Sequence, residues 1–149
     1  MIEKNLESQQ RFKKLLESLK IDLSFNKDQV IEINYLDVPI SIYYNEGLIV
    51  FYCTFLLEYK PSAAFTNILL STCNILEQPS VQVSKTDNEE ITLWSREWLD
   101  KISDDSFFEW LERFCEVSVD WQHLLEEYNS RQELRESIRF ARKNYINNI

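Results

Sequence analysis

The 149-residue sequence contains a single glycine, Gly47, and a single histidine, His123. Phosphate-binding loops and dinucleotide-binding motifs need several glycines, because the backbone must approach the ligand closely. One glycine therefore excludes both kinds of site. The histidine has no cysteine or acid at a metal-ligand spacing, so we interpret it as a surface or half-buried side chain.

Cysteines are few, and nothing in their arrangement indicates a bridge or a metal site. Cys53, Cys73 and Cys115 lie far apart in the sequence, and no CxxC or CxH spacing occurs. An odd, scattered set of this kind is typical of reduced, buried thiols in a cytosolic protein. We therefore expect no metal, no cofactor and a cytoplasmic location.

Long apolar segments are also lacking. The longest apolar run, 48–57 (LIVFYCTFLL), is too short to cross a bilayer as a helix, and its β-branched and aromatic residues favour a strand. The first residues, MIEKNLESQQ, lack the apolar core of a signal peptide. A net charge of −9 disfavours nucleic acid and anionic membranes as main partners.

Hydrophobic residues make up 44% of the chain, which is enough for a packed core, and their periodicity predicts the elements. We expect an amphipathic helix over about 5–20, three strands within 31–57, and a second helix from Pro61 to about Leu76. A hairpin with strands near Val81 and Ile91 and a turn at Asp87-Asn88 follows, and then a long helix to Tyr128. This order predicts an α+β fold: a twisted antiparallel sheet with helices packed on it.

Three local signals refine these elements. Asn45-Glu46-Gly47 predicts a tight hairpin turn in which Gly47 takes a positive φ. Pro39 cannot donate to a β-ladder, so its strand should be an edge or irregular there. Ser106 followed by Glu109 is a capping box, which predicts the start of the long helix.

The C-terminal part differs from the rest in charge. Residues 131–149 carry five basic and two acidic side chains, so they contribute +3 to the net charge of −9 and leave 1–130 at −12. We therefore divide the chain into a domain over 1–128 and a basic extension over 129–149. Ser130 with Glu133 predicts one further short helix there. It is either a solvated appendage, folded back on the acidic body, or a contact for an acidic partner.

No set of residues indicates catalysis. The adjacent acids at 89–90 and 104–105 point in different directions, and a polar turn and a helix N-terminus explain them better than an acid–base pair. No nucleophile–base motif occurs. We expect a protein that is not an enzyme, with a small acidic enzyme using dispersed carboxylates as the less favoured alternative.

The strand over 48–57 is apolar on both of its faces. Its alternating side chains form two sets: Leu48, Val50 and Tyr52, and Ile49, Phe51, Cys53 and Phe55. If all helices covered one face of the sheet, the other face should be polar. The second face is therefore covered by the chain's own first helix, by another copy of the chain or by a partner. The sequence leaves these three open.

The most distinctive pattern is a strand ending in a tryptophan, a bend with a bulky leucine and a long helix with an apolar stripe. It consists of Leu93, Trp94, Trp98, Leu99, Ile102, Phe107, Leu111, Phe114, Trp121 and Leu125. Together with the element order of residues 5–128, this pattern resembles the class I type III secretion chaperones, the Tir chaperone family of Gram-negative bacteria. The extension beyond Asn129 has no counterpart in that resemblance.

The resemblance implies a homodimer in the bacterial cytoplasm. It would hold the N-terminal chaperone-binding segment of a secreted effector in extended form and keep it competent for type III secretion. The secretion ATPase is a further partner that the resemblance allows. The alternative is a chaperone-like regulatory adaptor that titrates an anti-activator of secretion genes.

The resemblance also implies where the contacts lie. The first helix and the first three strands would line effector-binding grooves, with the candidates Leu15, Leu19, Ile31, Ile33 and Tyr35. The second helix would pair the protomers, with the candidates Phe65, Ile68, Leu69 and Thr72. For each of these residues, a place in the intramolecular core is the alternative.

Overall fold

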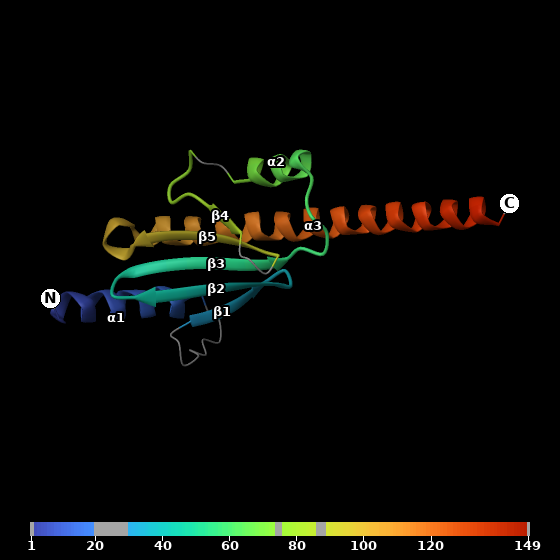
Figure 1. The fold of residues 1–149 in the computed structure, drawn as a ribbon. Helices are drawn as coiled ribbons and strands as arrows, with labels where there is room; N and C mark the ends of the chain where they lie inside the picture. Colours follow the sequence, from blue (N-terminus) through green and yellow to red (C-terminus); the bar gives the residue numbers. More distant parts are fainter. Residues whose placement is uncertain (1, 20–29, 74–75, 86–88, 149) are drawn as a thin grey trace.

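The structure is a computed structural model that describes residues 2–19, 30–73, 76–85 and 89–148. Its elements follow the predicted order of helix, three strands, helix, hairpin and long helix, which confirms the α+β fold (Figure 1). The elements are α1 (Ile2–Ser18), β1 (Val30–Tyr35), β2 (Val38–Asn45), β3 (Leu48–Leu56), α2 (Ala63–Ser71), β4 (Gln82–Lys85), β5 (Glu90–Trp98), the 3-10 helix η1 (Leu99–Lys101) and α3 (Asp104–Asn147).

The five strands form one antiparallel sheet in the order β1-β2-β3-β5-β4. β3 lies at the centre and pairs with β5 along its whole length, from Leu48 opposite Trp98 to Leu56 opposite Glu90. β2 pairs with β3 only from Ser41 to Asn45, so Pro39 lies beyond this ladder. Pro39 pairs only with Asn34 of β1, so β2 has a single neighbour at this position, although the strand as a whole lies between β1 and β3 and is not the predicted edge.

Two-residue turns join the first three strands, and both have positive φ angles. Glu46 (φ 48°) and Gly47 (φ 92°) link β2 to β3, which confirms the predicted turn. Leu36 (φ 48°) and Asp37 (φ 68°) link β1 to β2. A left-handed conformation suits the twist of a tight hairpin but is rare for leucine. The Leu36 side chain is 72% exposed, so packing within the described chain does not explain its presence there.

One face of the sheet carries the core, and both α1 and α3 pack on it. Phe51 of β3 contacts three rings of α3, with centroid distances of 4.0 Å to Trp110, 5.7 Å to Phe114 and 5.9 Å to Phe107. On the β2 side, Phe12 of α1 stacks on Tyr44 at 4.6 Å. Tyr44 and Phe51 point to the same face, because Tyr44 pairs with Ile49 two positions from Phe51. This is the inner face of the sheet.

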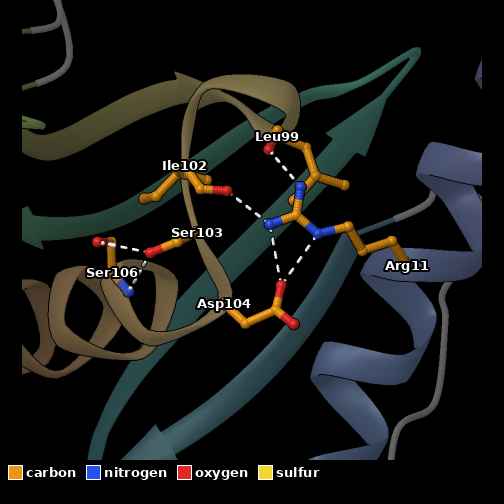
Figure 2. A network of polar contacts seen from close by, with 6 residues as sticks. All are labelled: Arg11, Leu99, Ile102, Ser103, Asp104 and Ser106. Carbon is orange, nitrogen blue, oxygen red and sulfur yellow. Dashed lines mark hydrogen bonds and ion pairs between the residues drawn. The ribbon is translucent and has the colours of Figure 1, made fainter.

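Arg11 fixes α1 to the connection between β5 and α3 (Figure 2). Its guanidinium donates hydrogen bonds to the carbonyl oxygens of Leu99 (2.8 Å) and Ile102 (2.5 Å), and it forms an ion pair with Asp104 at 2.9 Å. These acceptors lie around the start of α3. One arginine therefore places α1 beside α3 on the inner face.

α3 begins earlier than the capping box predicted. The N-cap is Ser103, whose side-chain oxygen accepts from the N–H of Ser106 at 3.2 Å, so the prediction that Ser106 caps the helix is wrong. Asp104 and Asp105 occupy the first turn, where negative charge is favourable to the helix dipole. The apolar stripe predicted on this helix is confirmed, since its residues from Phe107 to Leu125 are buried.

α3 is also longer than predicted. It runs without a break over 44 residues to Asn147, so the prediction of a separate short helix after Ser130 is wrong. The physical reason is local, because residues 129–147 contain no glycine or proline and are rich in helix-favouring residues. The division into a domain and a basic extension by charge remains a prediction.

α2 lies against α3 beyond the edge of the sheet. Phe65 stacks on Tyr128 at 4.0 Å, and the indole nitrogen of Trp121 donates to the Thr72 hydroxyl at 2.7 Å. The helix ends at Ser71, before the predicted end near Leu76, and residues 74–75 lie outside the described residues. The predicted turn at Asp87-Asn88 lies outside them as well.

Candidate functional site

The sheet has an outer face that no described helix covers. On β3 the side chains of the inner set, Ile49 to Phe55, are buried, whereas Leu48, Val50 and Tyr52 are half-buried and point to the opposite side. Because α1 and α3 both lie on the inner face, the first helix does not cover the second face. Of the three possibilities that the sequence left open, the described residues exclude coverage by the first helix, and another copy and a partner stay predictions.

Aromatic and aliphatic side chains line this outer face. Cross-strand neighbours place Tyr43 beside Val50 and Tyr52 beside Trp94. The Arg96 guanidinium lies 5.6 Å from the Trp94 ring, a cation–π distance. We define the outer face by Tyr43, Leu48, Val50, Tyr52, Trp94 and Trp98. An apolar, aromatic surface of this kind is typical of a protein-binding site.

The residues predicted to bind an effector lie mainly beneath α1. Leu15, Ile31 and Ile33 are 5%, 1% and 6% exposed, and Leu19 and Tyr35 are partly buried against the same core. All five belong to the core or pack against it, and Ile31 and Ile33 lie on the inner face of the sheet, on which α1 also packs. A partner would reach this set only if α1 moved away from the sheet, so their role in binding stays a prediction.

The edges of the sheet offer a second kind of contact. β1 and β4 are the outermost strands, and each pairs with one neighbouring strand among the described residues. β1 is six residues long, whereas β4 is four. An extended polypeptide binds such an edge through main-chain hydrogen bonds, with alternate side chains on each face. The longer β1 edge is the better candidate.

The four residues predicted for the homodimer interface fall on different sides of α2. Phe65 and Leu69 are 9% and 1% exposed and pack towards α3, and Thr72 is half-buried and bonded to Trp121. Only Ile68 is exposed, at 50%. The sequence reasoning missed Leu70, which is 46% exposed. The sequence did contain an indication of this, because α2 has no charged side chain, so some of its apolar residues must lie on its exposed side.

The groove between α2 and α3 has a volume of about 420 Å³ and is open to solvent. Its lining includes the apolar or aromatic Phe65, Ile68 and Tyr128 and the basic Lys60, Arg131 and Arg135. No group of three or more His, Cys, Asp or Glu side chains that could hold a metal lies within the described residues. His123 is exposed on α3, which confirms its interpretation as a surface side chain.

The thiols are buried, as predicted. Burial raises the pKa of Cys53 to about 11 and that of Cys115 to about 12, and it also raises the pKa of Cys73. At neutral pH these groups are therefore protonated and weakly nucleophilic. None of the described helices is long and apolar enough to span a membrane.

Comparison with known proteins places the fold. No protein-family model and no curated protein matches the chain. Among solved structures, a chain of the ExoU–SpcU complex of the Pseudomonas aeruginosa type III secretion system aligns with a TM-score of 0.61 and 16% identity, over 76% of this chain and 97% of that one.

Two further structures show the range of this fold. The Yersinia pestis type III secretion chaperone SycH, in complex with a fragment of YscM2, aligns with a TM-score of 0.55 and 12% identity, over 72% of this chain and 93% of that one. YbjN, a putative transcription regulator from E. coli, aligns with a TM-score of 0.55 and 11% identity, over 81% of this chain and 90% of that one. The fold of this chain is thus one that type III secretion chaperones have, as the resemblance implied.

Proposed function

We propose that the chain is a cytoplasmic chaperone that binds the N-terminal segment of a secreted effector in extended form and keeps it competent for type III secretion. The observation that carries this proposal is the outer face, an apolar and aromatic surface that no described helix covers. It occurs in a fold that type III secretion chaperones share. Among the described strands β1 pairs only with β2, so the other edge of residues 31–35 would offer main-chain hydrogen bonds to an extended chain.

The chemistry of the surface suits an unfolded client. A segment that becomes ordered on binding loses conformational entropy, so it must bury long apolar strips or extend a sheet. The outer face supplies the apolar strip through Tyr52, Trp94 and their neighbours. The buried set under α1, including Leu15 and Ile31, would contribute only after α1 moves.

We also propose that the chain forms a homodimer through α2. A nine-residue helix that has no charged side chain and exposes Ile68 and Leu70 suits burial against another protein surface. The alanines at 63 and 64 allow a second helix to approach closely. Light scattering should give twice the 17.9 kDa mass of the chain, and Ile68→Glu should reduce it towards the monomer.

The test of the chaperone proposal uses the secreted proteins encoded near the gene. Each is co-expressed with the chain, and any complex is isolated. The experiment is then repeated with a secreted protein whose N-terminal region is deleted. We expect one protein to bind and to lose binding on deletion. Tyr52→Ala should weaken binding, whereas Lys101→Ala, an exposed change on η1, should not. Binding to a folded C-terminal domain instead would contradict the proposal.

The same experiment separates the regulatory alternative. If the bound protein is an anti-activator of secretion genes and no effector binds, the chain acts as an adaptor that couples secretion to transcription. The outer face fits both kinds of client equally, so the identity of the partner decides between them.

A further inference from the structure

The last part of α3 extends beyond the rest of the molecule. We call residues 131–147 the arm, which Figure 1 shows in orange to red, continuing past the end of the sheet. Apart from Gln132, every side chain of the arm is exposed. The proposed chaperone function uses none of these residues. A helix that leaves a row of apolar side chains in water is suited to bind a partner with them.

Four apolar side chains of the arm form one stripe along the helix. Leu134, Ile138, Ala141 and Tyr145 follow each other at steps of four, three and four residues. Since an α-helix turns by about 100° per residue, these four lie within a sector of about 60°. Leu134, Ile138 and Tyr145 are 61%, 57% and 71% exposed. Such alternating steps are those by which two helices pack side by side, and we call these four residues the seam.

The two sides of the seam differ in charge. Arg135 and Arg142 lie on one side, about 70° to 90° from the centre of the seam. Ser137 and Asn144 lie at the mirror positions on the other side. In a pair of helices, side chains at these flanking positions reach across to the partner and determine which partner is accepted. The arm therefore offers two cations and no acid at these positions.

The two flanking arginines are available for a partner. Among the residues that the structure describes, neither Arg135 nor Arg142 forms an ion pair, whereas Arg131 pairs with Glu127 one turn earlier. Arg135 also lines the groove beside α2, together with Lys60 and Arg131. Cations thus gather on this side of the arm, although residues 1–130 carry a net charge of −12.

From this asymmetry we propose that the arm binds an amphipathic helix of another protein, in which Asp or Glu side chains flank the apolar stripe. That stripe covers the seam, and the acids pair with Arg135 and Arg142. A second arm fits poorly. In an antiparallel pair the arginines would face arginines, and in a parallel pair they would face Ser137 and Asn144. An anionic membrane is less suitable as well, because residues 1–130 would be repelled by it.

Two synthetic peptides test this inference on the full chain. Each has three heptads with leucine at both stripe positions, and the flanking positions are glutamate in one peptide and lysine in the other. Isothermal titration calorimetry gives the Kd of each. We expect the lysine peptide to bind about tenfold more weakly than the glutamate peptide, because charges across a helix pair decide partner choice. Absence of binding by the glutamate peptide, or equal Kd values, would overturn the proposal.

Three variants identify the side chains responsible. Arg135→Glu with Arg142→Glu should weaken the glutamate peptide about tenfold and strengthen the lysine peptide. Arg139→Glu with Lys143→Glu changes the net charge equally, but both positions lie more than about 120° from the centre of the seam, so the preference should stay. Ile138→Ser should weaken both peptides. Because all these positions are exposed, the urea midpoint of each variant should match that of the natural chain.

Two further measurements test other occupants of the arm. Sedimentation equilibrium should give the same association state for the natural chain and for Arg135→Glu with Arg142→Glu. Loss of association would identify a second copy as the occupant and overturn the proposal. Sedimentation with phosphatidylserine vesicles should show no binding, and binding that this variant loses would assign the arm to a membrane instead. Neither readout uses the secreted client, so failure here is distinct from failure of the proposed chaperone function.

Discussion

The indole N–H of Trp121 donates a hydrogen bond of 2.7 Å to the hydroxyl of Thr72, which itself donates to the Leu69 carbonyl at 2.7 Å. This short chain ties the end of α2 to the middle of α3. It rotates α2 so that Leu69 faces α3 and Ile68 faces solvent. Thr72, which was predicted to pair two protomers, therefore makes its hydrogen bonds within one protomer.

Replacing Thr72 with valine should therefore destabilise the fold. The change keeps the shape of the side chain but leaves the Trp121 N–H without its acceptor, at a cost of about 1–2 kcal/mol. Urea unfolding followed by tryptophan fluorescence measures the loss. Thr72→Ser keeps the hydroxyl and is the control, with a much smaller loss. Equal stability of the valine variant and the natural chain would contradict this role.

Ser95 holds a buried polar link in the core. It is fully buried, accepts from the Trp110 indole N–H at 2.8 Å and donates to the Ser80 carbonyl at 2.8 Å. Ser95→Ala removes both bonds and leaves a buried donor unsatisfied, so we expect a loss of about 2 kcal/mol in the free energy of unfolding. Ser137→Ala, at an exposed position of α3, should change the free energy of unfolding little in the same denaturation experiment.

Arg11 should be hard to replace even by lysine. Its planar guanidinium serves two carbonyl groups and the Asp104 carboxylate at once, a geometry that a single ammonium group cannot reproduce. Arg11→Lys should loosen α1, seen as faster amide hydrogen exchange over residues 6–18 while the exchange of β3 is unchanged. Lys14→Arg, an exposed change on the same helix, is the control. Unaltered protection of α1 in Arg11→Lys would disprove the anchoring role.

The buried thiols predict a pH dependence at the alkaline end. The pKa of Cys53 is raised from 9.0 to about 11 and that of Cys115 to about 12, so folding favours their protonated form. This contribution to stability is complete below pH 9 and is lost as the pH rises towards 11 and 12. The urea midpoint should therefore fall above pH 9.

Thiol labelling provides an independent check of the same burial. With iodoacetamide at pH 8, the native chain should react far more slowly than the urea-unfolded chain, because thiolate is scarce and access is blocked. Rapid labelling of Cys53 or Cys115 in the native state would contradict the buried, protonated state of these groups.

Much of the fold was predictable because its signals are local. Alternation of apolar residues identified β1 and β2, the apolar run over 48–57 identified β3, Pro61 marked the start of α2, and Gly47 marked the turn. The wrong predictions are also local in origin. Ser106 and Ser130 both start plausible capping patterns, but a better cap at Ser103 and an unbroken run of helix formers prevailed.

The candidate site was only partly predictable, since periodicity shows that a side chain is covered but not what covers it. Ile31 and Ile33 look equally apolar whether a helix of the chain or a partner lies above them, and the structure buries both on the inner face of the sheet, where α1 and α3 pack. Phe65 and Ile68 belong to one apolar helix, yet Phe65 is buried and Ile68 is exposed to solvent. The charges of residues 131–147 could be counted from the sequence, but the direction in which this part of α3 extends could not be predicted.

The sequence by itself determined the kind and order of the elements, the exclusion of glycine-rich phosphate and dinucleotide loops, and the charge contrast between residues 131–149 and the rest. These depend on neighbours a few positions apart along the chain. Only the tertiary structure decided which face of the sheet has no described helix on it, which side chains of α2 are exposed, and that α3 continues past the sheet. Those outcomes depend on packing between segments such as α1 and β5–α3, which are joined by Arg11 across about 90 positions.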